Sequence, residues 1–215
     1  IWFAFLGAVV TTVLVYMIGS VGRAGATPLR LTLAGVAIGA VLGGISSGIS
    51  LLNPDIFDRM RNWAAGSLVS SGYEAALAIL PFVIVGLLLA LIMARPLNAS
   101  ALGDDLASAL GANIIRTRIG TVISATLLAG SATAAAGPIG FVGLMVPHAA
   151  RWIVGPDQRW IFAYTIVLAP ILLLSADIVG RVVLRPAELQ VGIVTAFIGA
   201  PVLIALARRR RISGL

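Results

Sequence analysis

The chain has 215 residues, of which 60% are hydrophobic and 11% charged, and its mean hydropathy of +1.07 indicates a membrane protein with little room for a soluble domain. All fifteen basic residues are arginines, against eight acidic residues, for a net charge of +7. Without lysine the chain cannot form the Gly-Lys-Ser/Thr element of a P-loop, so we expect any nucleotide-driven work to use another subunit. Without cysteine the chain forms no disulfide.

Apolar stretches long enough to cross a bilayer follow one another along the whole chain. A crossing takes about 20 apolar residues in a helix. The stretches that fit are 1–19, 31–52, 75–94, 119–136, 161–176 and 191–207, and a shorter seventh stretch is 139–154. The sequence therefore predicts an all-α integral membrane protein, a polytopic helical bundle with about seven transmembrane helices in a single domain over residues 1–215.

The first stretch, 1–19, is predicted to be a true span. It has neither a positively charged leading region nor a small-residue cleavage site, which a signal peptide requires. Because the chain begins with Ile1 inside this span, we expect a fragment that lacks an N-terminal part.

The arginines gather at the ends of the predicted spans, a layout typical of membrane topology and not of nucleic-acid binding. If residues 19–29 face the cytoplasm, eleven arginines lie on that side and four on the other. The eleven are Arg23, Arg30, Arg95, Arg116, Arg118, Arg151, Arg159 and Arg208 to Arg211, and the four are Arg59, Arg61, Arg181 and Arg185. This asymmetry predicts a cytoplasmic C-terminus, with residues 208–211 resting on anionic lipid headgroups.

Small residues recur at every fourth position of the second span, at Gly35, Gly39 and Gly43. Such spacing lets helix backbones approach closely inside a bilayer. We interpret these glycines as helix-packing positions within one bundle, with a sliding or gating face as the alternative.

A short interfacial helix is predicted within residues 53–68, on the outer side of the membrane. Asn53-Pro54-Asp55 is typical of a helix start, because Asn caps the helix and Pro restricts the chain. The apolar face of this helix carries Ile56, Met60 and Trp63. Arg59 and Arg61 are expected to face water.

Residues 98–118 leave the membrane and return, and they contain a short two-faced helix. One face carries Leu102, Leu106, Ala109 and Leu110, and the other carries Asp104, Asp105 and Ser108. Gly111 stands where a left-handed helix cap is expected. We predict that this cytoplasmic segment presents its helix to a partner.

The stretch around the seventh span is unusual for a membrane helix. Gly137, Gly140 and Gly143 alternate with apolar residues, and we expect Pro147 to interrupt the helix before His148. His148 is the only histidine, so we assign it a packing or helix-end role and predict neither a metal site nor a catalytic site.

Asp177 and Arg181 lie four residues apart near the outer end of the span at 161–176, so they share a helix face and can pair. Two readings stay open. The pair is either a helix-end ion pair or part of a polar rim for docking or conduction.

Six segments together resemble one family, the FecCD-type permeases, which are the membrane subunits of iron-siderophore, haem and cobalamin ABC importers. The segments are LRLTLAGVAIGAVLGG, LLNPDIFDRMRNWAAGSL, LGDDLASALGANIIRTR, GPIGFVGLMVPHAARWIVGPDQRW, ADIVGR and AELQVGIVTAFIGAPVLI. The NPD-F-D-RMRNW-AGSL segment is most similar to the ferric-enterobactin branch.

The resemblance implies a type II importer fold of ten helices in the cytoplasmic membrane, of which this chain would hold the last seven. It implies a dimer of permeases over two ATPase subunits, with a periplasmic or lipid-anchored binding protein that delivers a ferric siderophore of catecholate type. Such a permease has no catalytic site and no cofactor of its own.

The resemblance also assigns roles to individual residues. For coupling to the ATPase, Asp105, Ala107 and Gly111 match the spacing of the EAA-type motif, with Asp105 in place of Glu and Leu106 in place of Ala, and Leu102 and Asp104 belong to the same segment. Thr27, Pro28 and Leu29 match a cytoplasmic gate loop. Arg181 matches a periplasmic arginine that meets acidic residues of the binding protein, and Arg61 is a weaker match for that role.

Several alternatives remain at this point. Haem or cobalamin could replace the siderophore, and the second permease could be identical or different, although the enterobactin branch favours a heterodimer. An ion-coupled secondary transporter would need acidic residues at mid-depth, where Asp177 is the nearest and lies toward one end. A structural or assembly protein of the membrane would not need the two-faced helix.

Overall fold

The computed structural model describes residues 2–21, 27–68, 72–185 and 187–209. Within these ranges all regular structure is helical. The helices are α1 (Trp2–Gly19), α2 (Pro28–Leu52), α3 (Pro54–Ala64), α4 (Tyr73–Ser100), α5 (Asp104–Ala109), α6 (Ile114–Ala136), α7 (Val142–Val154), α8 (Gln158–Val183) and α9 (Val191–Arg209). The predicted all-helical fold is confirmed.

Five helices, α1, α2, α4, α6 and α8, are long and apolar enough to cross a membrane, by length and composition. The other two predicted crossings correspond to α7 and α9, whose apolar parts, Val142–Val154 and Val191–Ala205, are shorter. Much of the apolar surface is open, and the most apolar window of α2 buries none of its residues. The hydrophobic exterior is what a chain solvated by lipid or by other membrane subunits requires.

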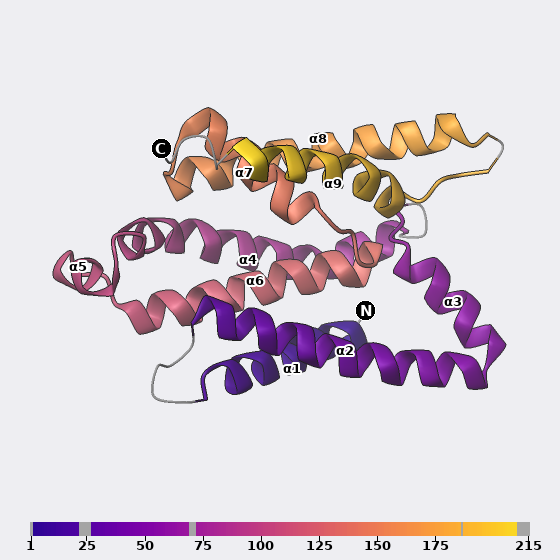
Figure 1. Cartoon of the computed structure of the whole chain (residues 1–215), viewed down its shortest axis with the longest axis horizontal. Coiled ribbons are helices and arrows are strands. Elements are labelled where there is room, and N and C mark those ends of the chain that lie inside the picture. The colour runs from indigo at the N-terminus through magenta and orange to yellow at the C-terminus, as the bar shows by residue number, and fades with distance from the viewer. Residues whose placement is uncertain (1, 22–26, 69–71, 186, 210–215) are drawn as a thin grey trace.

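The helices form three layers, with α1 and α2 on one side, α4 and α6 in the centre, and α7 to α9 on the other side (Figure 1). The central pair approaches closely because Gly86 lacks a side chain: a Cβ there would lie 2.8 Å from Cγ of Leu128. Ser124 donates its hydroxyl to the Gly86 carbonyl oxygen at 2.7 Å. Small residues and polar contacts thus hold α4 against α6, as is typical inside a bilayer.

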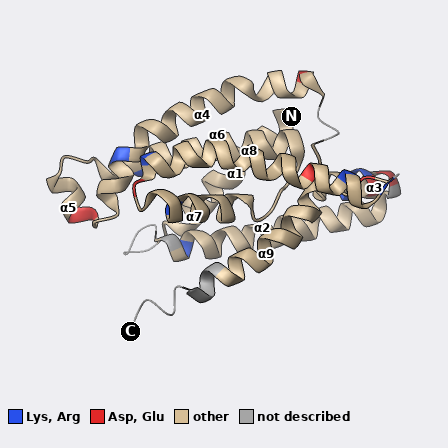
Figure 2. Cartoon of the chain, turned by 90° about the horizontal axis from the view of Figure 1, so that it is seen from above, with Lys and Arg blue, Asp and Glu red and all other residues tan. Residues whose placement is uncertain are grey.

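The layered arrangement sorts the connections to two opposite ends of the bundle. The start of α2, the α5 segment, the α7–α8 connection and the last turn of α9 lie at one end, and α3 and the last turn of α8 lie at the other (Figure 1). The charged residues gather near these ends, and the middle of the helices carries none among the described residues (Figure 2). Of the arginines used to predict orientation, Arg23, Arg210 and Arg211 lie outside the described residues.

The short helix predicted within residues 53–68 is present as α3. Asn53 has extended backbone, and its side chain accepts a hydrogen bond from the Asp55 N–H at 3.2 Å, while Pro54 occupies the first turn. The Asn-Pro start therefore works by the capping that the sequence predicts.

Backbone hydrogen bonds hold the chain after α3 to the end of α6 and to the start of α9. The Ser67 N–H donates to the Ala136 carbonyl at 2.9 Å, and the Gly192 N–H donates to the Gly66 carbonyl at 3.2 Å. Gly66 has a φ of +67°, and a Cβ on Gly192 would collide with the Ala65 carbonyl oxygen. Side chains at these glycines would force the backbones apart.

The prediction that Pro147 interrupts the helix before His148 is wrong. Pro147 lies inside α7, and the break comes earlier, over residues 137–141, where Gly137 and Phe141 have φ values of +74° and +66°. Pro147 is the sixth residue of α7, so the bond it removes would involve a carbonyl of the first turn, where the helix can adjust. His148 Nδ1 lies 2.8 Å from the Leu144 carbonyl oxygen, one turn back in the same helix.

Candidate functional site

The candidate coupling surface is the α5 segment, which projects from the end of the bundle between α4 and α6 (Figure 1). Gly103, with a φ of +100°, starts the helix, and Gly111, with a φ of +82°, follows its end. The Gly111 N–H donates to the Ser108 carbonyl and the Ala112 N–H to the Ala107 carbonyl, at 3.0 and 2.9 Å. These two bonds form a Schellman motif, so Gly111 takes the left-handed position predicted for it.

The leucines of this segment point away from the rest of the chain. Leu102, Leu106 and Leu110 are 60%, 58% and 68% exposed, whereas Ala107 is fully buried. Only the small side chain therefore packs on this chain, and the predicted apolar face is left open. An exposed row of leucines at a polar end of a membrane protein is typical of a protein-binding surface.

A salt bridge anchors α5 to the first turns of α6. Arg118 Nη2 donates to Asp104 Oδ2 at 2.7 Å, and both side chains are about half exposed. Asn113 caps α6 by accepting from the Arg116 N–H at 3.0 Å. Asp105, the other carboxylate of the segment, is exposed. The segment is thus held at its base while its leucines and Asp105 remain accessible.

A second anchor joins the last turn of α4 to the start of α8. Asn98 donates to Asp157 and accepts from the Gln158 N–H, at 2.6 and 2.8 Å. Sequence reasoning missed Asn98 and Asp157. The role of Asp157 as an N-cap was predictable, since Gly155-Pro156-Asp157 before a helix is typical of an N-cap. No feature of the sequence indicated its hydrogen bond with Asn98.

The predicted gate residues begin α2, at the same end of the bundle as α5 (Figure 1). Thr27 is the N-cap, and its hydroxyl oxygen accepts from the Arg30 N–H at 3.4 Å. Pro28 starts the helix, and Leu29 is exposed. The structure therefore brings the candidate gate and the candidate coupling segment to one end.

The predicted docking arginines, Arg61 and Arg181, lie at the opposite end, on α3 and α8. Arg181 Nε donates to Asp177 Oδ2 at 2.8 Å, and its Nη1 lies 3.7 Å from Glu188 Oε1. Arg61 Nη2 lies 3.4 Å from Asp58 Oδ1, with both side chains largely exposed. The helix-end ion pair predicted from the sequence is present, and about half of the Arg181 side chain is exposed.

Gly35, Gly39 and Gly43 do not pack within the described part of this chain. A Cβ at any of them would meet no atom within 4 Å. Within the described residues these glycines therefore meet no other helix, and their role in helix packing stays a prediction. The face remains open to a sliding or packing contact with another subunit.

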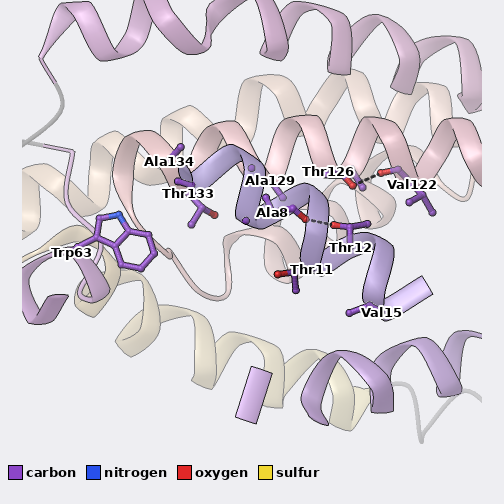
Figure 3. Close-up of a pocket in the computed structure, with 14 residues that line it drawn as sticks. Ala8, Thr11, Thr12, Val15, Trp63, Val122, Thr126, Ala129, Thr133 and Ala134 are labelled. Atoms are coloured by element: carbon purple, nitrogen blue, oxygen red, sulfur yellow. Dashed lines mark hydrogen bonds between the residues drawn. The ribbon is translucent and has the colours of Figure 1, made fainter. Parts of the chain in front are cut away.

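An apolar groove of about 560 Å³ runs between α1 and α6 and ends at Trp63 (Figure 3). Two of the four threonines that line it bond within their own helices: Thr12 donates to Ala8 O and Thr126 to Val122 O, each at 2.8 Å. The wall is therefore apolar in character and lacks a convergent polar site. Among the described residues no group of three His, Cys, Asp or Glu side chains could hold a metal ion.

The profile of the FecCD transport family matches residues 1–209. The chain belongs to this family. It is 50% identical over 212 residues to the ferric enterobactin transport system permease protein FepD of Escherichia coli (strain K12), which covers 98% of this chain and 63% of that protein. This chain therefore spans less than two thirds of the length of that relative.

Other members of the family differ in their named substrates. The chain is 38% identical to the Fe(3+)-citrate import system permease protein YfmD of Bacillus subtilis (strain 168), over 97% of this chain and 62% of YfmD. It is 32% identical to the hemin transport system permease protein HmuU of Yersinia pestis, with the same coverage of 97% and 62%. A solved structure described as an inward-facing conformation of a metal-chelate type ABC transporter superposes with a TM-score of 0.86 and 25% identity, over 95% of this chain and 65% of that one.

Proposed function

We propose that this chain belongs to the permease subunit of an ATP-driven importer that carries a ferric siderophore of catecholate type across the cytoplasmic membrane. The observation that supports this most strongly is the 50% identity to FepD over 98% of the chain, against 32% to the hemin permease HmuU. A haem or cobalamin importer is the second candidate, and the shared family supports it.

The proposed complex holds this permease and a second permease, which in the enterobactin branch is a different chain, over two ATPase subunits. A binding protein, periplasmic or lipid-anchored, delivers the cargo. In this arrangement α5 contacts an ATPase through Leu102, Leu106 and Leu110, and Asp105 and the Gly111 turn set its orientation. The permease has no catalytic site, and the ATPases supply the chemistry.

The end-to-end separation of the candidate sites fits alternating access. ATP binding would draw the ATPases together and move α5, and the gate at Thr27, Pro28 and Leu29 lies at the same end of the bundle. Arg181, with Arg61 as the weaker candidate, would receive the binding protein at the far end. The C-terminus and α5 then face the cytoplasm, as the arginine asymmetry predicts.

The test is reconstitution of the full-length permease with its ATPases and second permease in proteoliposomes, with binding protein and radiolabelled iron. We expect ATP-dependent uptake of ferric enterobactin that exceeds uptake of haem. Uptake of haem or cobalamin in its place would favour the second candidate. Uptake driven by a proton or sodium gradient without ATP would refute an ABC importer.

A further inference from the structure

Asn98 uses both ends of its amide to hold a helix that begins about sixty residues later in the chain. Its Nδ2 donates to Asp157 Oδ1 at 2.6 Å, and its Oδ1 accepts from the Gln158 backbone N–H at 2.8 Å. Both side chains are half-buried. We call this pair of hydrogen bonds between Asn98 and the start of α8 the Asn98–Asp157 clamp.

Capping of α8 does not require Asn98. Asp157 is the N-cap, and its Oδ1 accepts from the Arg159 N–H at 2.9 Å, a bond in which Asn98 takes no part. The hydrogen bond from Asn98, followed by that from the Arg159 N–H, lowers the pKa of Asp157, so the carboxylate is ionised at neutral pH. The two hydrogen bonds of Asn98, one donated to Asp157 and one accepted from the Gln158 N–H, are therefore additional to the cap that Asp157 provides, and they join α4 to α8.

The position of the clamp places it between the coupling segment and the helix that reaches the opposite end of the bundle. Asn98 is in the last turn of α4, and only residues 101–103 separate this helix from α5. On its other side α5 is tied to α6 by Asp104 and Arg118. α8 runs from the clamp to Arg181, so a displacement of α5 can pass through α4 to a helix that ends beside the candidate docking site.

We propose that Asn98 and Asp157 are positioning residues of transport, and that their clamp is the link through which movement of the α5 segment reaches α8. This inference rests on the proposed function. The groups need not touch the cargo or the ATPase. Their role is to make the last turn of α4 and the first turn of α8 move together. ATP hydrolysis then stays coupled to docking of the binding protein at the opposite end of the bundle.

The first variant is Asn98→Ala, which removes both bonds of the clamp and leaves the α8 cap in place. Its matched control is Ser100→Ala, two residues on, because the Ser100 hydroxyl donates to Pro96 O in its own helix at 3.0 Å. In the complete complex we expect Asn98→Ala to keep its membrane level and basal ATP hydrolysis. Stimulation by cargo-loaded binding protein and iron uptake per ATP should fall by about fivefold or more, as the loss of two hydrogen bonds suggests. Ser100→Ala should behave as the wild type.

The second variant transposes the pair, Asn98→Asp with Asp157→Asn. An amide and a carboxylate again face each other, a carboxylate oxygen can accept from the Gln158 N–H, and the amide oxygen can cap α8. We expect stimulation and uptake to recover above those of Asn98→Ala, with some loss because a carboxylate at the end of α4 is disfavoured by the helix dipole.

Three outcomes would overturn the inference: wild-type coupling in Asn98→Ala, a loss of thermal stability that accounts for its loss of uptake, or no recovery in a transposed pair that reaches the membrane at the wild-type level. Failure of the proposed function looks different. In that case the wild-type complex itself takes up no ferric siderophore, whereas the clamp is tested by the ratio of stimulated to basal hydrolysis in a complex that transports.

Discussion

Leu106 offers the sharpest test of the α5 surface, because burial of its exposed side chain against a partner would contribute favourably to the free energy of binding. It is 58% exposed in this chain and stands at the centre of the leucine row. Full burial of a leucine contributes about 1.5–3 kcal/mol, so covering the exposed part contributes about 1–2 kcal/mol. Truncation to alanine in Leu106→Ala should therefore weaken ATPase binding by about 5- to 30-fold.

The affinity of the ATPase for the full-length permease would be measured in nanodiscs, and ATP hydrolysis would be followed in the same preparation. Leu88→Ala is the matched control, since Leu88 is 55% exposed but lies on α4, away from α5. We expect the affinity to fall for Leu106→Ala alone, with the stability of the permease unchanged. An unchanged affinity, or equal losses in both variants, would show that the leucine row does not contact the ATPase.

Further predictions concern the turn after α5, the orientation, the docking site and the locked junction near α3. Gly111→Pro should leave the permease in the membrane but abolish stimulated ATP hydrolysis, because it removes an N–H of the Schellman motif and the left-handed φ of +82°. Stimulated hydrolysis in proteoliposomes measures this effect, and normal uptake would contradict the prediction. The chain has no cysteine, so single cysteines can be placed at Ala187 and at Ser108. An impermeant maleimide added outside spheroplasts should label the cysteine at position 187 and not the one at position 108. The reverse pattern would invert the orientation. Arg181→Glu should weaken docking of the binding protein severalfold, with a strong salt dependence, since exposed ion pairs contribute roughly 0.2–1 kcal/mol each. Basal ATP hydrolysis should stay intact. Unchanged docking with a less stable permease would make Arg181 an ion-pair partner within the chain alone. Gly192→Ala should lower the melting temperature of the permease, because the added Cβ would collide with a backbone carbonyl oxygen. Gly35→Ala, where the space is open, should leave it unchanged. Equal melting temperatures of the two variants would refute the packing argument.

Sequence alone determined the features that depend on neighbouring residues. Long apolar runs predicted the membrane-crossing helices, since crossing depends on local length and hydropathy. Asn53-Pro54 predicted the start of α3, and Gly111 predicted the left-handed turn after α5, because capping needs only a few consecutive residues. The motifs also carried the family, which the comparison confirms over residues 1–209.

The tertiary structure decided everything that depends on which helices meet. Periodicity placed Leu106 on an apolar face, but only the packing shows that Ala107 is buried and that the leucines are open. Gly35 has the spacing of a packing position, yet α2 lies at the edge of the described bundle and leaves it uncovered. The Asn98–Asp157 clamp joins residues 59 apart. Hydropathy and capping act along the chain, whereas such contacts arise from the relative placement of whole helices, which no local pattern records.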